Sequence, residues 1–281
     1  MKILATGATG QYARLVVPAL VERGLEVRAV VHDPAKADIP IAHGAKETVQ
    51  ADLDDPASLD NALKGVDGVF VITPAFHPRE TELGLNMVEA AKRAEVSKIV
   101  YNGVYHPSLQ LPNHATTRPV EHALYSSNLD FTVLQPAMYV QALADIYQQA
   151  LESGEVVLPW SMHSLFTYVD YRDVAEVAAI AFVSDLLSFG TFELAAGGMI
   201  DRSEIARLMT KAAGRELVAA DLPSSVDAAA GGPEGLATMF AQYDEHGFHG
   251  GNSIVLRSIL GREPRSVADF IAELGESRKS G

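Results

Sequence analysis

Residues 1–31 read MKILATGATGQYARLVVPALVERGLEVRAVV, and this stretch decides the fold. A short apolar run at residues 2–6 leads directly into a turn that contains two glycines. An amphipathic helical stretch follows and ends at Gly24, and a second run rich in β-branched residues spans residues 26–31. Strand, glycine turn, helix and strand in this order form the repeating unit of a parallel α/β sheet.

The same alternation continues to about residue 135. Helical stretches separate the β-branched runs, and Asp55-Pro56 combines an N-capping side chain with a proline at the first helical position. We predict six strands, at residues 2–6, 26–31, 47–50, 68–72, 98–101 and 132–135. The predicted fold class is therefore α/β, with a Rossmann-type doubly wound parallel sheet over residues 1–135.

Residues 136–281 have a less regular pattern, which includes an aromatic and methionine-rich stretch. Asp201 with Glu204, and Ser266 with Asp269, have the spacing of capping boxes and predict two helix starts. We expect this part of the chain to be mainly a small α+β substrate-binding lobe, with segments that return to the core.

The composition is that of a globular protein: 48% of the 281 residues are hydrophobic, 21% are charged, and no apolar run is long enough to cross a bilayer. A formal net charge of −14 argues against nucleic acid as a partner, because phosphate binding needs clustered positive charge. The lack of cysteine excludes thiolate metal ligands and thiol nucleophiles, and no metal site is expected. Without a signal-peptide pattern, we expect a cytoplasmic protein that acts on a small molecule and has no membrane partner.

The glycine turn has the spacing GxxGxxA, formed by Gly7, Gly10 and Ala13. A turn without side chains lets backbone N–H groups approach a pyrophosphate, and a small third residue lets the helix pack closely on the strand. A tight turn without a ligand would have the same spacing. The position between a strand and a helix, and the strands that follow, favour a dinucleotide site.

The end of the second strand normally distinguishes NAD from NADP. Here Asp33 precedes a proline, so it is either a helix N-cap or a ligand of the ribose hydroxyls. If it is a cap, His32 and Lys36 are the groups that face the cofactor, and they favour a 2′-phosphate mildly, so that NADP is favoured over NAD. After the third and fourth strands, the residues predicted either to contact the cofactor or to shape its loops are Asp52, Leu53, Thr73 and Pro74.

None of the nine tyrosines is followed four residues later by lysine, so the tyrosine–lysine pair of many short-chain dehydrogenases is missing. Open α/β sheets bind ligands at the carboxyl ends of their strands. After the fifth strand we therefore assign Asn102 to cofactor binding, and Tyr105 and His106 to a proton-donating role. Because His106 precedes a proline, it is alternatively an ordinary turn residue without a catalytic role.

Several aromatic and polar side chains of the second half could form a pocket for a flat substrate, although such spacing is equally typical of an apolar core. These residues are Tyr139, Trp160, His163, Phe166 and Tyr168.

The stretches GATGQYA, KIVYNGVYHP and YVDYRDVAEVAA, with others that span nearly the whole length, resemble the NmrA-like family of atypical short-chain dehydrogenases/reductases. The resemblance implies a Rossmann core that binds NAD(P) and a small C-terminal substrate lobe. It also implies cofactor contacts for a set of residues that matches the family pattern: Gly7, Thr9, Gly10, Gln11, Tyr12 and Lys36.

Two departures from the family pattern affect the predicted chemistry. His32 stands where an arginine is usual, and Thr117 stands where members that transfer hydride often have a lysine. Arg118 is adjacent, but one step along a helix turns a side chain by about 100°.

Two functions are therefore compatible with the sequence. The first is an NAD(P)H-dependent reductase of a hydrophobic conjugated small molecule such as a quinone or enone, and it is the one we favour. The second is a non-catalytic NAD(P)-sensing regulatory protein with a protein partner. A cofactor-assisted isomerase or cyclase needs the same pocket and stays a third alternative.

Overall fold

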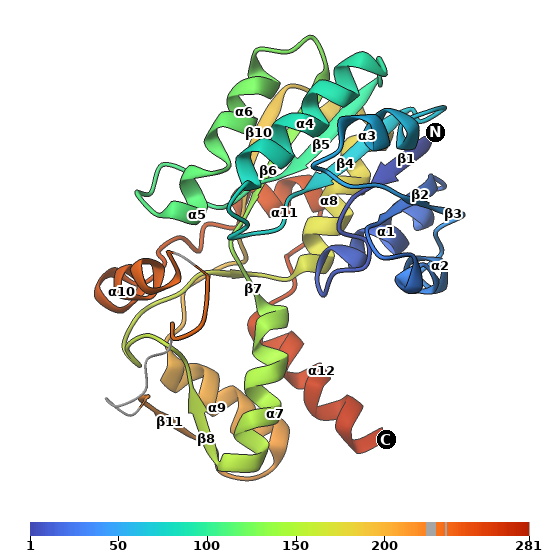
Figure 1. Cartoon of the computed structure of the whole chain (residues 1–281). Coiled ribbons are helices and arrows are strands. Elements are labelled where there is room, and N and C mark those ends of the chain that lie inside the picture. Colours follow the sequence, from blue (N-terminus) through green and yellow to red (C-terminus); the bar gives the residue numbers. More distant parts are fainter. Residues whose placement is uncertain (223–228, 234, 281) are drawn as a thin grey trace. The chain divides into compact units, whose positions relative to one another are not determined.

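The structure is a computed structural model that describes residues 1–222, 229–233 and 235–280. The chain divides into two compact units (Figure 1). Unit 1 contains residues 1–136 and 171–194, and unit 2 contains residues 137–170 and 195–281. None of the helices in the described ranges has the length and apolar character that a membrane crossing needs.

Unit 1 is built on a seven-stranded sheet with the order β10-β6-β5-β4-β1-β2-β3. Every neighbouring pair in it is parallel. The strands are β1 (Lys2–Ala5), β2 (Glu26–Val31), β3 (Glu47–Gln50), β4 (Gly68–Ile72), β5 (Lys98–Asn102), β6 (Asp130–Pro136) and β10 (Gly190–Leu194). The predicted Rossmann-type doubly wound sheet is confirmed.

Helices connect these strands and cover the sheet. Helix α1 packs on α8, and α4 packs on both α3 and α6. The helices of unit 1 are η1 (Ala13–Leu15), α1 (Val16–Glu22), η2 (Pro34–Lys36), α2 (Asp38–Ala42), α3 (Pro56–Ala62), α4 (Glu80–Arg93), α5 (Pro112–Ala115), α6 (Arg118–Tyr125), α8 (Tyr171–Val183) and η4 (Asp185–Leu187).

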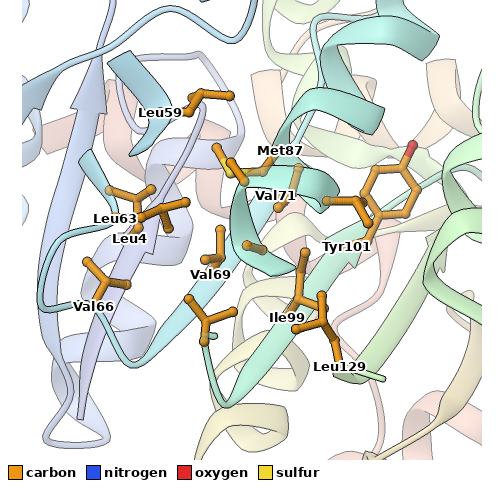
Figure 2. Close-up of a cluster of buried hydrophobic side chains, with 14 of the residues drawn as sticks. Leu4, Leu59, Leu63, Val66, Val69, Val71, Met87, Ile99, Tyr101 and Leu129 are labelled. Atoms are coloured by element: carbon orange, nitrogen blue, oxygen red, sulfur yellow. The ribbon is translucent and has the colours of Figure 1, made fainter. Parts of the chain in front are cut away.

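The core between the sheet and the helices α3, α4 and α6 is a cluster of buried hydrophobic side chains, most of them aliphatic (Figure 2). Val69 and Ile99 come from β4 and β5, while Leu59 and Met87 come from α3 and α4, and all four are fully buried. Burying such a side chain stabilises the folded state by about 1.5–3 kcal/mol. The continuous apolar runs of the strands are therefore explained by burial on both faces of a parallel sheet.

Unit 2 contains two small parallel pairings, β7 with β9 and β8 with β11. Its elements are β7 (Met138–Tyr139), η3 (Val140–Ala142), α7 (Leu143–Ser153), β8 (Glu155–Val157), β9 (Tyr168–Val169), α9 (Arg202–Ala213), β11 (Val218–Ala220), α10 (Leu236–His246), α11 (Ile254–Leu260) and α12 (Val267–Ser280). Helix α12 packs closely on α9, because a Cβ on Gly275 would lie 2.7 Å from the carbonyl oxygen of Ala212.

The helix starts predicted from capping residues are confirmed. Asp55 accepts a hydrogen bond from the backbone N–H of Ala57, and Asp201 accepts one from that of Glu204. Ser266 and Asp269 bond each other reciprocally at the start of α12. The strand β10 was not predicted, because it lies beyond the regular alternation and pairs with a strand more than fifty residues earlier in the chain.

Candidate cofactor and active site

The order of the sheet reverses between β1 and β4, which lie side by side although β2 and β3 separate them in the chain. At such a point the loops after the two strands run in opposite directions and leave a crevice for a ligand. Thr6 closes the end of this pair, since its hydroxyl donates to the carbonyl oxygen of Ile72 at 2.9 Å and accepts from the N–H of Ile72 at 2.8 Å. The start of the glycine turn is thereby held on the neighbouring strand.

The glycine turn itself leaves no room for side chains at its first position. Gly7 has a φ of 68°, and a Cβ there would lie 2.5 Å from Cγ2 of Ile72 and 3.0 Å from Cβ of Ala13. The N–H of Gly10 donates to the carbonyl oxygen of Gly7 at 2.8 Å, so the turn is closed on itself. The residues present fit a pyrophosphate, because neither Gly7 nor Gly10 carries a side chain that would keep the group away from the backbone. Gln11 lies exposed, and Thr9 and Tyr12 are half-buried beside it.

The loop after β2 shows that Asp33 is a helix N-cap. Its carboxylate accepts a hydrogen bond from the N–H of Ala35 at 2.9 Å and caps η2, so the predicted capping role is confirmed. His32 and Lys36 are exposed, and Nδ1 of His32 lies 3.8 Å from a carboxylate oxygen of Asp52. The assignment of His32 and Lys36 to a 2′-phosphate stays a prediction.

Replacing both His32 and Lys36 with alanine is expected to weaken NADPH binding about tenfold and to leave NADH binding within twofold. The 2′-phosphate is present only in NADPH, and two exposed cations contribute a modest electrostatic attraction to it. Binding constants from calorimetry for the two cofactors measure this. An equal loss for both cofactors would contradict the assignment, and Lys46→Ala, on an exposed lysine paired with Glu26, is the matched control.

The loops after β3 and β4 are held by side chains that the sequence did not single out. The side chain of Asn86 donates to the carbonyl oxygen of Leu53 at 2.9 Å. The buried carboxylate of Glu80 accepts from the hydroxyl of Thr73 at 3.1 Å and from the N–H of Phe76 at 3.2 Å. Burial raises the pKa of Glu80 above its ordinary value. In the sequence, the position of Glu80 in the first turn of a helix that follows a strand was the only sign of its contact with this loop. Pro74, in the same loop, is exposed.

Asn102 ends β5 and is buried. Its side-chain oxygen accepts a hydrogen bond from the hydroxyl of Tyr171 at 3.2 Å. Tyr171 is the first residue of α8 and is fully buried, so a segment nearly seventy residues later in the chain fixes the amide of Asn102. The loop after β5 then crosses the end of β6, with hydrogen bonds from the N–H of Gly103 to Leu134 and from that of Tyr105 to Pro136.

The two residues assigned to proton donation have different surroundings. Tyr105 is 3% exposed, and burial raises the pKa of its phenol above the ordinary value, with the negative charge of Glu193 adding to the effect. The side chain of His106 is 34% exposed, and its Nδ1 lies 2.7 Å from Oε1 of Glu193. The two rings are in contact, with centroids 3.9 Å apart. Glu193 is missing from the prediction because it lies on β10, far from His106 in the sequence.

Thr117 occupies a structural position at the start of α6. It is buried, and its hydroxyl donates to the carbonyl oxygen of His114 at 3.0 Å. Arg118 is exposed at the first position of the helix. His114 is fully buried, and burial lowers the pKa of its imidazole. The described residues of unit 1 therefore place no lysine at this position of the β5–α6 region.

The aromatic residues proposed for the substrate belong to unit 2, where three of them, Trp160, Phe166 and Tyr168, pack in one cluster. The rings of Trp160 and Phe166 stack with centroids 4.3 Å apart, and Tyr243 meets both rings edge-on. Phe166 and Tyr168 are buried, whereas Trp160 and Tyr139 are half-buried. Within the cluster, Phe166 and Tyr168 thus lie in the interior, and Trp160 retains exposed surface.

Arg202 fixes the backbone around Trp160. Its guanidinium donates to the carbonyl oxygen of Leu158 at 3.0 Å and also to that of Trp160. His163 is exposed and lines a cavity of about 440 Å³ within unit 2. The other residues that line it are Ser161, Ser164, Leu165, Asp244, Glu245, His246, Gly247 and His249. Within the described ranges, no group of three or more histidine or acidic side chains is arranged to hold a metal ion.

The sequence pattern and the geometry agree with a comparison against protein families, in which the model of the NmrA-like family matches residues 1–271. The chain belongs to the NmrA-like family. Among curated NmrA-like relatives, NAD(P)H azoreductase of Xenophilus azovorans is 29% identical over 277 residues, which cover 95% of this chain and 96% of the azoreductase. Quinone oxidoreductase 2 of Escherichia coli is 28% identical over 285 residues, which cover 97% of this chain and 98% of that protein.

Two solved structures extend the comparison of this NmrA-like chain. The NADPH-dependent quinone oxidoreductase of Escherichia coli, crystallised with NADPH, has a TM-score of 0.82 at 27% identity and covers 97% of this chain and 99% of its own. The negative transcriptional regulator NmrA, crystallised with NAD, has a TM-score of 0.76 at 17% identity and covers 99% of this chain and 96% of its own. The second likeness shows a shared fold alone.

Proposed function

We propose that this protein is an NADPH-dependent oxidoreductase that reduces a hydrophobic conjugated small molecule, such as a quinone, an enone or a related carbonyl compound. The observation that carries the proposal is the intact Gly7–Gly10 turn at the reversal of the strand order, in a chain that matches an NADPH-bound quinone oxidoreductase over 97% of its length. The relative named NAD(P)H azoreductase supports an NAD(P)H-dependent reductase as well.

The cofactor would bind along the carboxyl ends of the strands. The backbone of Gly7 and Gly10 would receive the pyrophosphate, and His32 and Lys36 would receive the 2′-phosphate. Strands β2 and β3 would then carry the residues that hold the adenosine half, and β4, β5 and Asn102 would carry those that hold the nicotinamide half. When bound, the reduced nicotinamide supplies a hydride, which is the part of the reaction that the protein itself cannot perform.

The protein has to supply the proton that accompanies the hydride. Tyr105 retains its proton strongly, since burial raises the pKa of its phenol, and it is almost inaccessible. The side chain of His106 is accessible, and imidazole is the side chain that most often serves as a general acid or base. We therefore assign proton donation to His106 and treat Tyr105 as the ring that packs against it.

Threonine at position 117, in place of a lysine, affects how well the protein can stabilise negative charge on the reduced substrate. A lysine beside the reacting oxygen would stabilise an alkoxide, and the lack of such a group costs about 10²- to 10³-fold in rate for a simple ketone. Quinones and extended enones become delocalised anions and need less stabilisation. In unit 2, the predicted substrate residues Trp160, Tyr139 and His163 retain exposed surface, whereas Phe166 and Tyr168 are buried.

NADPH oxidation with a panel of quinones and enones is expected to exceed that with a matched panel of simple ketones by at least about 100-fold in kcat/KM. The physical reason is the charge delocalisation of the reduced product in the absence of an ammonium group at Thr117. The decrease in absorbance of NADPH measures both panels. Equal rates for ketones and quinones would contradict the substrate class.

A non-catalytic NADP-sensing protein is the second candidate, and the observation that favours it is the buried threonine at position 117. The same assay separates the two functions. Tight NADPH binding without oxidation of NADPH by any compound of either panel would favour the sensor, and a protein partner would then be sought in the two redox states. An isomerase or cyclase would convert its substrate without net consumption of NADPH.

A further inference from the structure

The loop that carries His106 is directed toward the outer edge of the sheet by backbone hydrogen bonds. The N–H of Gly103 donates to Leu134 at 2.8 Å and that of Tyr105 to Pro136 at 3.1 Å, so the chain after β5 runs along the end of β6. Strand β10 lies on the far side of β6 and presents Glu193 one position before its last residue. His106 therefore reaches a carboxylate two strands away from the strand that precedes it in the chain.

The contact between these side chains determines which ring nitrogen carries hydrogen. Nδ1 of His106 lies 2.7 Å from Oε1 of Glu193. An ionised carboxylate only accepts hydrogen bonds, so Nδ1 is the donor. The other ring nitrogen, Nε2, is then the atom that loses and regains a proton when the imidazole acts as an acid or a base.

The backbone at His106 is also held in an unusual conformation. Its φ is 52°, in the left-handed region that non-glycine residues rarely adopt. Nδ1 of the buried His114 donates to the carbonyl oxygen of His106 at 3.0 Å, and the N–H of Leu109 donates to the same oxygen at 3.0 Å. Such a conformation persists only where the surrounding structure determines it.

We propose that Glu193 is a positioning residue that holds His106 with hydrogen on Nδ1 and aims Nε2 at the substrate. The proton-transfer step of this inference rests on the proposed function, whereas the contact between His106 and Glu193 does not depend on it. As the hydride reaches a carbon or oxygen of the conjugated substrate, Nε2–H of the imidazolium gives its proton to the oxygen that becomes negative. The imidazole is left neutral with its Nδ1–H still donated to Glu193, and the exposed ring regains a proton from water.

The first test reads the hydrogen position directly, without cofactor or substrate. In ¹⁵N-labelled protein, the ring nitrogens of His106 are assigned by comparison with His106→Asn, and their chemical shifts above the titration range of imidazole report the tautomer. We expect one tautomer, with hydrogen on Nδ1, in the unaltered protein and a mixture of both in Glu193→Gln, whose amide can donate as well as accept. An unchanged tautomer in Glu193→Gln would overturn the proposal.

The second test is kinetic and uses a quinone reduced by the unaltered protein. Glu193→Gln is expected to lower kcat about tenfold or more, with KM and NADPH affinity within twofold, because the ring is misoriented while the binding surfaces are retained. Glu82→Gln, on an exposed glutamate of α4, is the matched control and should leave all three values unchanged. An unchanged kcat in Glu193→Gln would also overturn the proposal.

The two tests separate failure of this inference from failure of the proposed function. If the unaltered protein oxidises NADPH with no quinone or enone, the reductase assignment fails, while the tautomer measurement still decides whether Glu193 orients His106. If quinone reduction is found but neither the tautomer nor kcat responds to Glu193→Gln, the reductase assignment stands and the positioning role is wrong. Thermal unfolding of each variant identifies a general loss of structure.

Discussion

Gly10→Asp is expected to lower NADPH affinity by at least 100-fold, which corresponds to about 2.7 kcal/mol of binding free energy. The new carboxylate would stand in the turn where backbone N–H groups would receive the pyrophosphate, and it would repel that group. A Cβ at Gly10 would lie 3.1 Å from the carbonyl oxygen of Gly7, which is tight but does not require a new backbone conformation. The fold should therefore be retained, and calorimetric titration with NADPH measures the loss.

Gly24→Asn is the matched control for this experiment. Gly24 follows α1 with a φ of 76°, has no atom within 4 Å of the position of a Cβ, and lies at the opposite end of the helix from the glycine turn. Asparagine tolerates the left-handed conformation, so NADPH affinity should stay within twofold. If Gly10→Asp binds NADPH and NADH as tightly as the unaltered protein, the turn has only a structural role.

His106→Asn is expected to lower kcat for quinone reduction about 100-fold, since a positioned general acid typically contributes 10²- to 10⁴-fold. Asparagine is chosen because it accepts the positive φ of this position and cannot transfer a proton at neutral pH. NADPH affinity should stay within twofold, because His106 lies after β5 and not at the glycine turn. Steady-state kinetics and a binding titration together measure these values.

Tyr105→Phe and His122→Ala serve as comparisons for this variant. Tyr105→Phe retains the ring that packs on His106 and should lower kcat less than tenfold. His122 is exposed on α6, and its removal should have no effect. A larger loss in Tyr105→Phe than in His106→Asn would transfer the proton-donating role to the phenol and contradict the present assignment.

The sequence predicted the parts of this fold that local chemistry controls. Runs of β-branched residues gave the six strands from β1 to β6 with errors of at most two residues at an end. Proline after a capping aspartate located the starts of η2 and α3, and Ser266 with Asp269 located that of α12. The glycine turn could be recognised for the same reason, because the positive φ and close packing of Gly7 are needs of the turn itself.

The tertiary structure decided which distant side chains meet. The pairing of His106 with Glu193 joins residues 87 positions apart, and that of Asn102 with Tyr171 joins residues 69 positions apart. No local pattern indicates such contacts, because they depend on the parallel placement of β10 beside β6 and on the entry of α8 into unit 1. The burial that separates accessible His106 from nearly inaccessible Tyr105 likewise arises only when the loop after β5 packs across the end of β6. Propensity, capping and turn geometry act over a few residues and can be read along the chain, whereas burial and ion pairing depend on neighbours that only the folded chain brings together.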